Sequence, residues 1–277
     1  AFGRGAGVTV PHVGEAGALN ADSYRAQAAA VLATYPQLDV FAAQLDRAMP
    51  GTNVDVEKVL SFDLADAILD RRALFVAEAG GDRAKGLAAF DAQPWSPRRQ
   101  AFEDLWQDGR RFVYCAPNPG TLGALKYGDY CLSIDPQSLE QADTGVFPAD
   151  TAQTYTNDMA VVDAVRAHQE VGAWWSRSDV ALSHFGEGVV NLSPEERAEL
   201  ICGADAYMEI VTVGPIALDQ VTVLRVKKDL WDEHNELWWK WKDNVLTDPT
   251  KLAKAKAYDA LLRWEDRGMA IIEADGQ

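Results

Sequence analysis

The spacing of apolar residues changes along this chain, and the change limits the folds available to it. From residue 22 to about residue 108, apolar side chains recur at helical spacing, and Ser96-Pro97 is typical of a further helix start. After Arg111 the pattern becomes short apolar runs separated by turn signals, at 112–115, 130–134, 207–213 and 221–226. Helical spacing returns from about residue 229. Helices, then strands, then helices predict an α+β fold with a mixed β core.

The same pattern suggests four segments. Residues 1–21 are rich in Gly and other small residues, and we expect a flexible arm there. Residues 22–108 read as a helical N-terminal region, 109–228 as an α+β core, and 229–277 as a helical pair that packs on the core. A chain of 277 residues suits one large domain or two moderate ones.

The charge balance is strongly acidic, with 26 basic and 42 acidic residues and a net charge of −16. This balance opposes nucleic-acid binding, and no apolar run is long enough to span a bilayer. The three cysteines have no CxxC pair, so we expect reduced thiols and no metal site, with one disulfide plus a free thiol as the alternative. The chain opens at Ala1 and not at Met, so we expect a processed or excised piece. A secreted effector and a cytoplasmic protein both fit, and the oligomeric state stays open.

One carboxylate breaks the apolar pattern of its strand. In residues 207–213 (YMEIVTV) both faces are largely apolar, which is typical of a central strand covered on both sides. Glu209 lies in this run, and a buried carboxylate is costly unless it is paired or lines a cavity. Facing a cleft, Glu209 would be a candidate catalytic group. An edge strand with Glu209 in water, or a structural salt bridge, is the alternative.

Three segments resemble a known enzyme family. Residues 126–136 (KYGDYCLSIDP), 147–151 (FPADT) and 206–226 (AYMEIVTVGPIALDQVTVLRV) resemble the ADP-ribosyltransferase domains of bacterial polymorphic toxins. The resemblance covers roughly residues 111–226. It implies an ADP-ribosyltransferase type of core and an effector protein that consumes NAD, as an ADP-ribosyltransferase acting on a protein acceptor or as an NAD glycohydrolase.

The resemblance also implies roles for individual residues. Glu209 would be the catalytic carboxylate, and Arg111, or Arg110 beside it, would bind the NAD phosphates. Tyr127 or Tyr155 would stack on the nicotinamide, and Asp150 and Thr151 would shape the pocket.

A non-catalytic interaction or structural protein is the alternative from another class. Its docking face would be the tryptophan-rich C-terminal region, because tryptophan is enriched at protein interfaces. That region holds Trp231, Trp238, Trp239, Trp241 and Trp264. A helical pair that packs on a sheet would account for the same residues.

Overall fold

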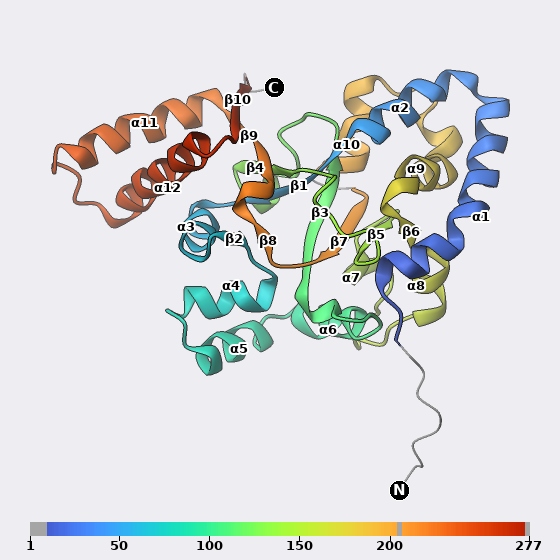
Figure 1. Cartoon of the computed structure of the whole chain (residues 1–277), viewed down its shortest axis with the longest axis horizontal. Coiled ribbons are helices and arrows are strands. Elements are labelled where there is room, and N and C mark those ends of the chain that lie inside the picture. Colours follow the sequence, from blue (N-terminus) through green and yellow to red (C-terminus); the bar gives the residue numbers. More distant parts are fainter. Residues whose placement is uncertain (1–9, 204–206, 275–277) are drawn as a thin grey trace, which may run out of the picture.

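A computed structural model describes residues 10–203 and 207–274, and over these residues the protein has an α+β fold built on one eight-stranded sheet (Figure 1). All neighbouring strands are antiparallel except the last pair in the chain, β9 and β10, which is parallel. In spatial order the strands are β10 (Ala270–Ala274), β9 (Val221–Lys227), β4 (Tyr130–Ile134), β1 (Met49–Val54), β3 (Phe112–Asn118), β7 (Glu209–Val213), β5 (Thr144–Phe147) and β6 (Gly172–Ala173). Two short strands, β2 (Ala67–Ile68) and β8 (Ile216–Ala217), pair separately.

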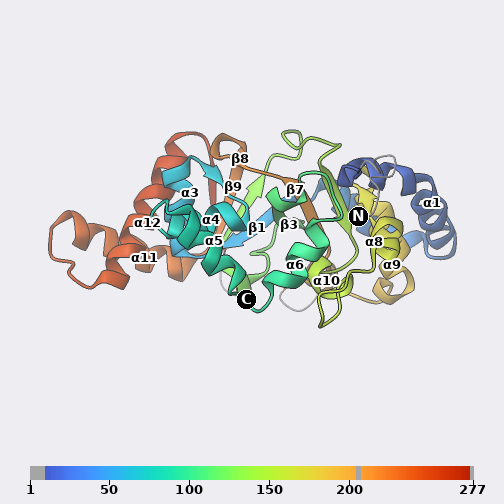
Figure 2. The same ribbon diagram turned by 90° about the horizontal axis from the view of Figure 1, so that it is seen from below.

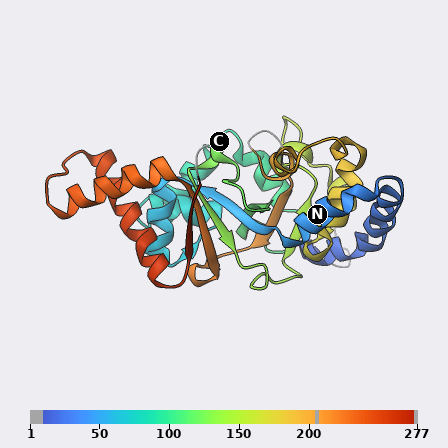
Figure 3. The same cartoon turned by 90° about the horizontal axis from the view of Figure 1, so that it is seen from above.

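The helices cover the sheet at both ends and on one side. In chain order they are α1 (Val13–Thr34), α2 (Asp39–Arg47), α3 (Val56–Ala65), α4 (Arg71–Glu78), α5 (Arg83–Asp91), α6 (Ser96–Glu103), α7 (Thr151–Thr154), α8 (Ala164–Glu170), α9 (Arg177–Phe185), α10 (Pro194–Cys202), α11 (Lys228–Lys242) and α12 (Pro249–Asp266). Helices α1, α8 and α9 lie at the β5–β6 end of the sheet, and α11 and α12 extend from the opposite end (Figures 1 and 3). Figure 2, seen from below, shows α4, α5 and α6 on the near side.

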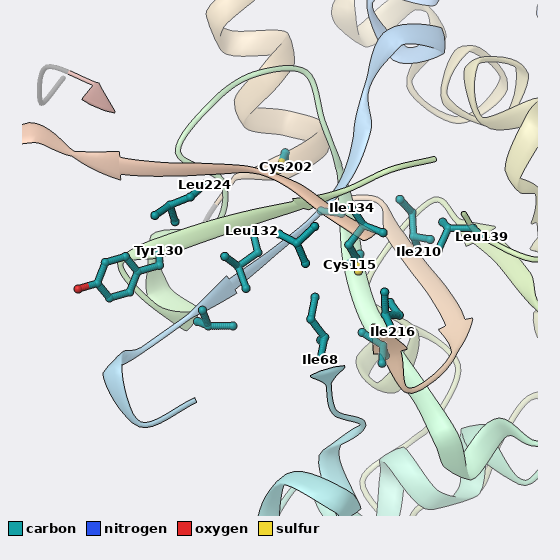
Figure 4. Packing of buried hydrophobic residues seen from close by; sticks show 14 of the residues in the cluster. Ile68, Cys115, Tyr130, Leu132, Ile134, Leu139, Cys202, Ile210, Ile216 and Leu224 are labelled. Atoms are coloured by element: carbon teal, nitrogen blue, oxygen red, sulfur yellow. The ribbon is translucent and has the colours of Figure 1, made fainter. Parts of the chain in front are cut away.

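The main core lies between the sheet and its helices. Figure 4 shows its centre, where Leu132 and Ile134 of β4 meet Cys115 of β3 and Ile210 of β7, each at most 4% exposed. Burial of one such side chain stabilises the fold by roughly 1.5–3 kcal/mol. All three cysteines are free and buried, as expected for reduced thiols.

A second, smaller core fixes helix α6 against the sheet. It is aromatic, with Phe102 of α6 and the following Trp106 packed against Phe112, Phe147 and Tyr155. This contact sets the orientation of α6, whose other inward residues therefore point toward strands β3 and β7.

The flexible arm expected over residues 1–21 is wrong from Val13 onward, while residues 1–9 lie outside the described part. Helix α1 starts at Val13. Its small residues let the helix pack closely against neighbouring backbone, and they do not make this segment flexible. A Cβ added to Gly17 would lie 2.4 Å from the backbone carbon of Gly172, and one added to Gly14 would lie 1.9 Å from the carbonyl oxygen of Gln141.

The boundary expected at residue 108 is also wrong, because strand β1 lies in the middle of the sheet between β4 and β3. Its sequence, MPGTNV, has turn-forming residues in place of an apolar alternation. Gly51 serves a close approach, because a Cβ there would lie 2.9 Å from the Cβ of Asn118. The N-terminal region and the core therefore share one sheet.

The C-terminal helical pair is present but does more than pack on the core. Helix α11 contacts β9, α12 contacts α3, and the chain then adds β10 beside β9. Over residues 10–203 and 207–274, no helix combines the length and the apolar character that crossing a membrane requires.

Candidate active site

Glu209 lies at the start of β7, in the interior of the sheet, and is 2% exposed. It lines a small inner cavity of ≈ 70 Å³ whose other walls come from β1, β3, α4 and α6. The edge-strand alternative is thus excluded, because β7 lies between β3 and β5. Burial of a carboxylate beside a cavity is the arrangement expected of a functional group.

The two oxygens of Glu209 have different surroundings. Oε2 accepts a hydrogen bond from the backbone nitrogen of Thr151 at 2.8 Å and a second from the Thr151 hydroxyl. Oε1 lies 3.9 Å from Nη1 of Arg99, too far for a hydrogen bond. Burial raises the pKa of Glu209 to about 7, against the opposing effects of Arg99 and Thr151. One oxygen is therefore held in place and the other is available to a ligand.

Arg99 is positioned by helix α6 and by an aromatic ring. Its guanidinium carbon lies 3.7 Å from the centre of the Tyr114 ring, a cation–π contact that fixes the plane of the group. Nη1 of Arg99 is buried and has no hydrogen-bond partner among residues 10–203 and 207–274. A buried donor without a partner is costly, and a ligand acceptor in the cavity would satisfy it.

Two tyrosines, Tyr127 and Tyr207, also line the inner cavity, and Asp150 is bonded to one of them. The hydroxyls of Tyr127 and Tyr207 are 3.0 Å apart, and the Tyr207 hydroxyl donates to Oδ2 of Asp150 at 2.6 Å. Asp150 also caps α7 by accepting from the backbone nitrogen of Gln153. Burial raises the pKa of Tyr207, and the negative charges of Glu209 and Asp150 add to that effect. The Tyr207 phenol therefore stays neutral near pH 7.

A larger cavity of ≈ 690 Å³ shares Arg71, Arg99 and Tyr127 with the inner one. Its further walls carry the cations Lys58, Arg98 and Lys126. Lys58 and Arg98 pair with Asp55 and Asp158.

Arg71 and Lys126 form no ion pair with any residue in the described ranges. Lys126 lies 5.0 Å from the centre of the Tyr127 ring. Burial, together with nearby Arg99, lowers the pKa of Arg71, against the opposing effects of Tyr127, Asp55 and Tyr114. The larger cavity is lined by five cations and three aspartates, so its lining is net positive in a protein with a net charge of −16 and favours anions.

Four of the six residues expected at the site meet there. Glu209, Tyr127, Asp150 and Thr151 line the cavities or bond to a residue that does.

Arg111 and Tyr155 lie elsewhere, so their expected roles are not supported. Arg111 donates to the Gly214 carbonyl at 2.5 Å, and neighbouring Arg110 pairs with Asp104 outside both cavities. Tyr155 is buried in the aromatic core and donates to Glu170 at 2.9 Å. The guanidinium groups that line both cavities are instead those of Arg71 and Arg99.

Arg71, Arg99 and Tyr207 were missed from the sequence, although two of them carried a signal. Arg99 lies three residues before Phe102, on the inward face of the same helix. Tyr207 lies two residues before Glu209 and therefore on the same side of an extended chain. Arg71 had no such local signal, because it follows the N-cap Asp70 of a short helix.

The residues present define what the cavity can do chemically. A carboxylate near neutral pKa, two guanidinium groups and two phenols suit an anionic ligand with a centre that becomes positive during reaction. Among the described residues, no group of three or more His, Cys, Asp or Glu side chains is arranged to hold a metal ion. Comparisons of the chain with family models, with curated proteins and with solved structures found no match.

Proposed function

We propose that the protein cleaves the nicotinamide–ribose bond of NAD, as an ADP-ribosyltransferase or an NAD glycohydrolase of the effector type. One observation carries this proposal: Glu209 has one oxygen fixed by Thr151 and the other facing a cavity that also holds Arg71 and Arg99. The carboxylate would stabilise positive charge on the ribose, and the guanidinium groups would bind the pyrophosphate.

The resemblance noted in the sequence gains support from the way its three segments meet. Tyr127 comes from the first segment, Asp150 and Thr151 come from the second, and Tyr207 and Glu209 from the third. These residues are joined by hydrogen bonds across as many as 80 positions of sequence. The three segments that resemble one enzyme family therefore meet at the same cavity.

In the proposed reaction the bond between the ribose C1′ and the nicotinamide nitrogen breaks, and its electron pair leaves with the neutral nicotinamide. The ribosyl carbon becomes cationic, and ionised Glu209 stabilises it through Oε1. Water, or a nucleophilic side chain of a protein acceptor, then bonds to C1′ and loses one proton to solvent. The products are nicotinamide and either free or protein-bound ADP-ribose.

The larger of the two cavities has the size of a ligand pocket. The inner cavity of ≈ 70 Å³ is a small recess beside Glu209, Tyr127 and Tyr207. The adjoining ≈ 690 Å³ lies within the usual range of ligand pockets, roughly 300–1,000 Å³. The pyrophosphate would cross between them at Arg71 and Arg99, which line both.

The alternative, an interaction protein that docks through its tryptophans, has one observation in its favour: Trp239 is 58% exposed on α11. Two of the other rings nearby are used within the fold. Trp231 packs on Tyr258, and Nε1 of Trp238 donates to Asp259 at 2.8 Å. A single exposed ring is a small docking surface, so the cavity supports the enzyme better.

The proposal is tested by incubating the purified protein with NAD and measuring nicotinamide release, with Glu209→Gln and the exposed Glu236→Gln in parallel. We expect release by the parent and by Glu236→Gln, and none by Glu209→Gln. A thermal-shift assay with NAD would separate a transferase that waits for its acceptor, which is stabilised without turnover, from a protein that does not bind NAD. Equal release by parent and Glu209→Gln would contradict the role of Glu209, and the absence of both release and stabilisation would contradict the proposed function.

A further inference from the structure

A second buried carboxylate, Glu103, lies outside both cavities and has no part in the reaction described above. It is 1% exposed on α6, one helical turn after Arg99. Its Oε2 accepts from Nη1 of Arg72 at 2.5 Å, and its Oε1 accepts from the Tyr114 hydroxyl at 3.0 Å. A buried carboxylate with two donors is a firm anchor for both of them.

Tyr114 connects this anchor to the cavity. Its hydroxyl is bonded to Glu103, while its ring lies under the Arg99 guanidinium, 3.7 Å from the guanidinium carbon. The ring also lines the inner cavity. Any movement of the ring would therefore move Arg99 relative to Glu209, whose Oε1 is 3.9 Å from Arg99 Nη1.

The Glu103–Tyr114 bond also affects the strength of the cation–π contact. Donation of the phenol proton to a carboxylate increases the electron density of the ring, which attracts the guanidinium more strongly. Glu103 and Arg99 lie on the same face of α6, four residues apart. Tyr114 therefore contacts both residues, Glu103 through its hydroxyl and Arg99 through its ring.

We propose that Glu103 and Tyr114 are positioning residues that hold Arg99 against the ring of Tyr114 with its free Nη1 directed to the ligand beside Glu209. The inference rests on the proposed function for its catalytic meaning. The positioning of Arg99 can be tested without reference to NAD, because Arg99 lowers the pKa of Glu209 and a displaced Arg99 would change that pKa.

The charged and titratable groups around Glu209 come from several elements. They are Arg99 on α6, Arg71 on α4, Tyr114 and Cys115 on β3, Asp150 at the start of α7, Tyr127, and Tyr207 just before β7. Among these Arg99 is the group that most opposes the effect of burial on the pKa of Glu209. If Arg99 moves away, the pKa of Glu209 rises above its value of about 7.

The test measures the pKa of Glu209 by carbon NMR of side-chain carboxyls, with its resonance assigned through its loss in Glu209→Gln. The variants are Tyr114→Phe, which keeps the ring but removes the hydroxyl, and Glu103→Gln, which keeps an acceptor but removes the charge. We expect a higher pKa of Glu209 in Tyr114→Phe and a smaller rise in Glu103→Gln. If Glu103→Gln does not fold, Tyr114→Phe alone decides.

Kinetics provide the second readout. For Tyr114→Phe we expect a roughly three- to tenfold lower kcat at pH 7 and a midpoint of the pH–rate profile displaced to higher pH. An unchanged pKa of Glu209 in Tyr114→Phe would overturn the positioning role whatever the activity. A raised pKa in a protein whose parent form neither binds nor consumes NAD would retain the positioning role and reject the proposed function.

Discussion

Thr151 holds one oxygen of Glu209 through two hydrogen bonds, from its backbone nitrogen at 2.8 Å and from its hydroxyl. Thr151 is the first residue of α7, and it follows Asp150, which caps that helix. The orientation of the carboxylate therefore depends on a helix start 58 residues earlier in the chain. This arrangement leaves Oε1 of Glu209 as the oxygen that a ligand can reach.

Replacing Thr151 by valine keeps the shape of the side chain and the backbone bond but removes the hydroxyl. We expect nicotinamide release to fall about tenfold, because a less constrained carboxylate is worse placed for the transition state. The pKa of Glu209 should rise, since the hydroxyl bond lowers it. Thr250→Val, at an exposed position of α12, is the matched control. Equal activity of the two variants would show that the hydroxyl is dispensable.

Glu209→Gln should stabilise the folded protein at neutral pH. The carboxyl has a pKa of 4.5 in the unfolded chain and about 7 when folded, so between these values the folded state binds more protons. The free energy of unfolding of the parent therefore decreases as pH rises through this window, and the loss is complete above about pH 7. Above that pH we expect the variant to be more stable by roughly 3 kcal/mol, with the difference disappearing toward pH 4.5.

Urea unfolding at several pH values measures this difference. A variant that is less stable than the parent at pH 8 would mean that ionised Glu209 stabilises the fold, as a structural salt bridge with Arg99 would. The experiment thus decides between the two interpretations that the sequence left open for Glu209.

Arg71→Gln should weaken binding of NAD and of ADP-ribose by at least about tenfold, because a guanidinium that faces anionic phosphates is lost. Its stability should be unchanged or higher, since Arg71 has no ion pair with any described residue and its pKa is lowered by burial. Calorimetric titration measures the affinity for NAD and ADP-ribose, and thermal unfolding measures the stability. Arg25→Gln, which removes an exposed charge on α1, is the control. Unaltered affinity in Arg71→Gln would place the phosphates elsewhere.

Gly17→Ala tests the assignment of α1 to the folded core. A Cβ at this position would lie 2.4–2.5 Å from three backbone atoms of Gly172 and Ala173, and backbone cannot move aside easily. We expect a loss of about 2–3 kcal/mol in the free energy of unfolding, of the size seen for overpacking. Gly188→Ala is the control, since nothing lies within 4 Å of its Cβ position. An unchanged free energy of unfolding in Gly17→Ala would contradict the packing of α1 on Gly172 and Ala173.

Local patterns were enough for some features of the protein and insufficient for others. The strand with Glu209 was predicted because its apolar residues are contiguous. Strand β1 could not be predicted, because Pro50 and Gly51 read as a turn and pair only through long-range contacts. The glycines of α1 predicted flexibility from the sequence. In the fold they allow close packing against segments more than 100 residues away, which no local pattern could indicate.

The same distinction applies to the site. Glu209 was predicted because it interrupts an apolar strand pattern, and Asp150, Thr151 and Tyr127 were predicted because the resemblance covers the segments that contain them. Arg71 and Arg99 come from helices α4 and α6, well before those segments, and only the fold places them beside Glu209.

The most direct test of the account is the pH dependence of nicotinamide release from NAD. The account predicts release by the parent that rises with pH through about 7, as Glu209 becomes ionised, and no release by Glu209→Gln at any pH. Release that is independent of pH between 5 and 9, or that persists in Glu209→Gln, would contradict a catalytic role of the Glu209 carboxylate.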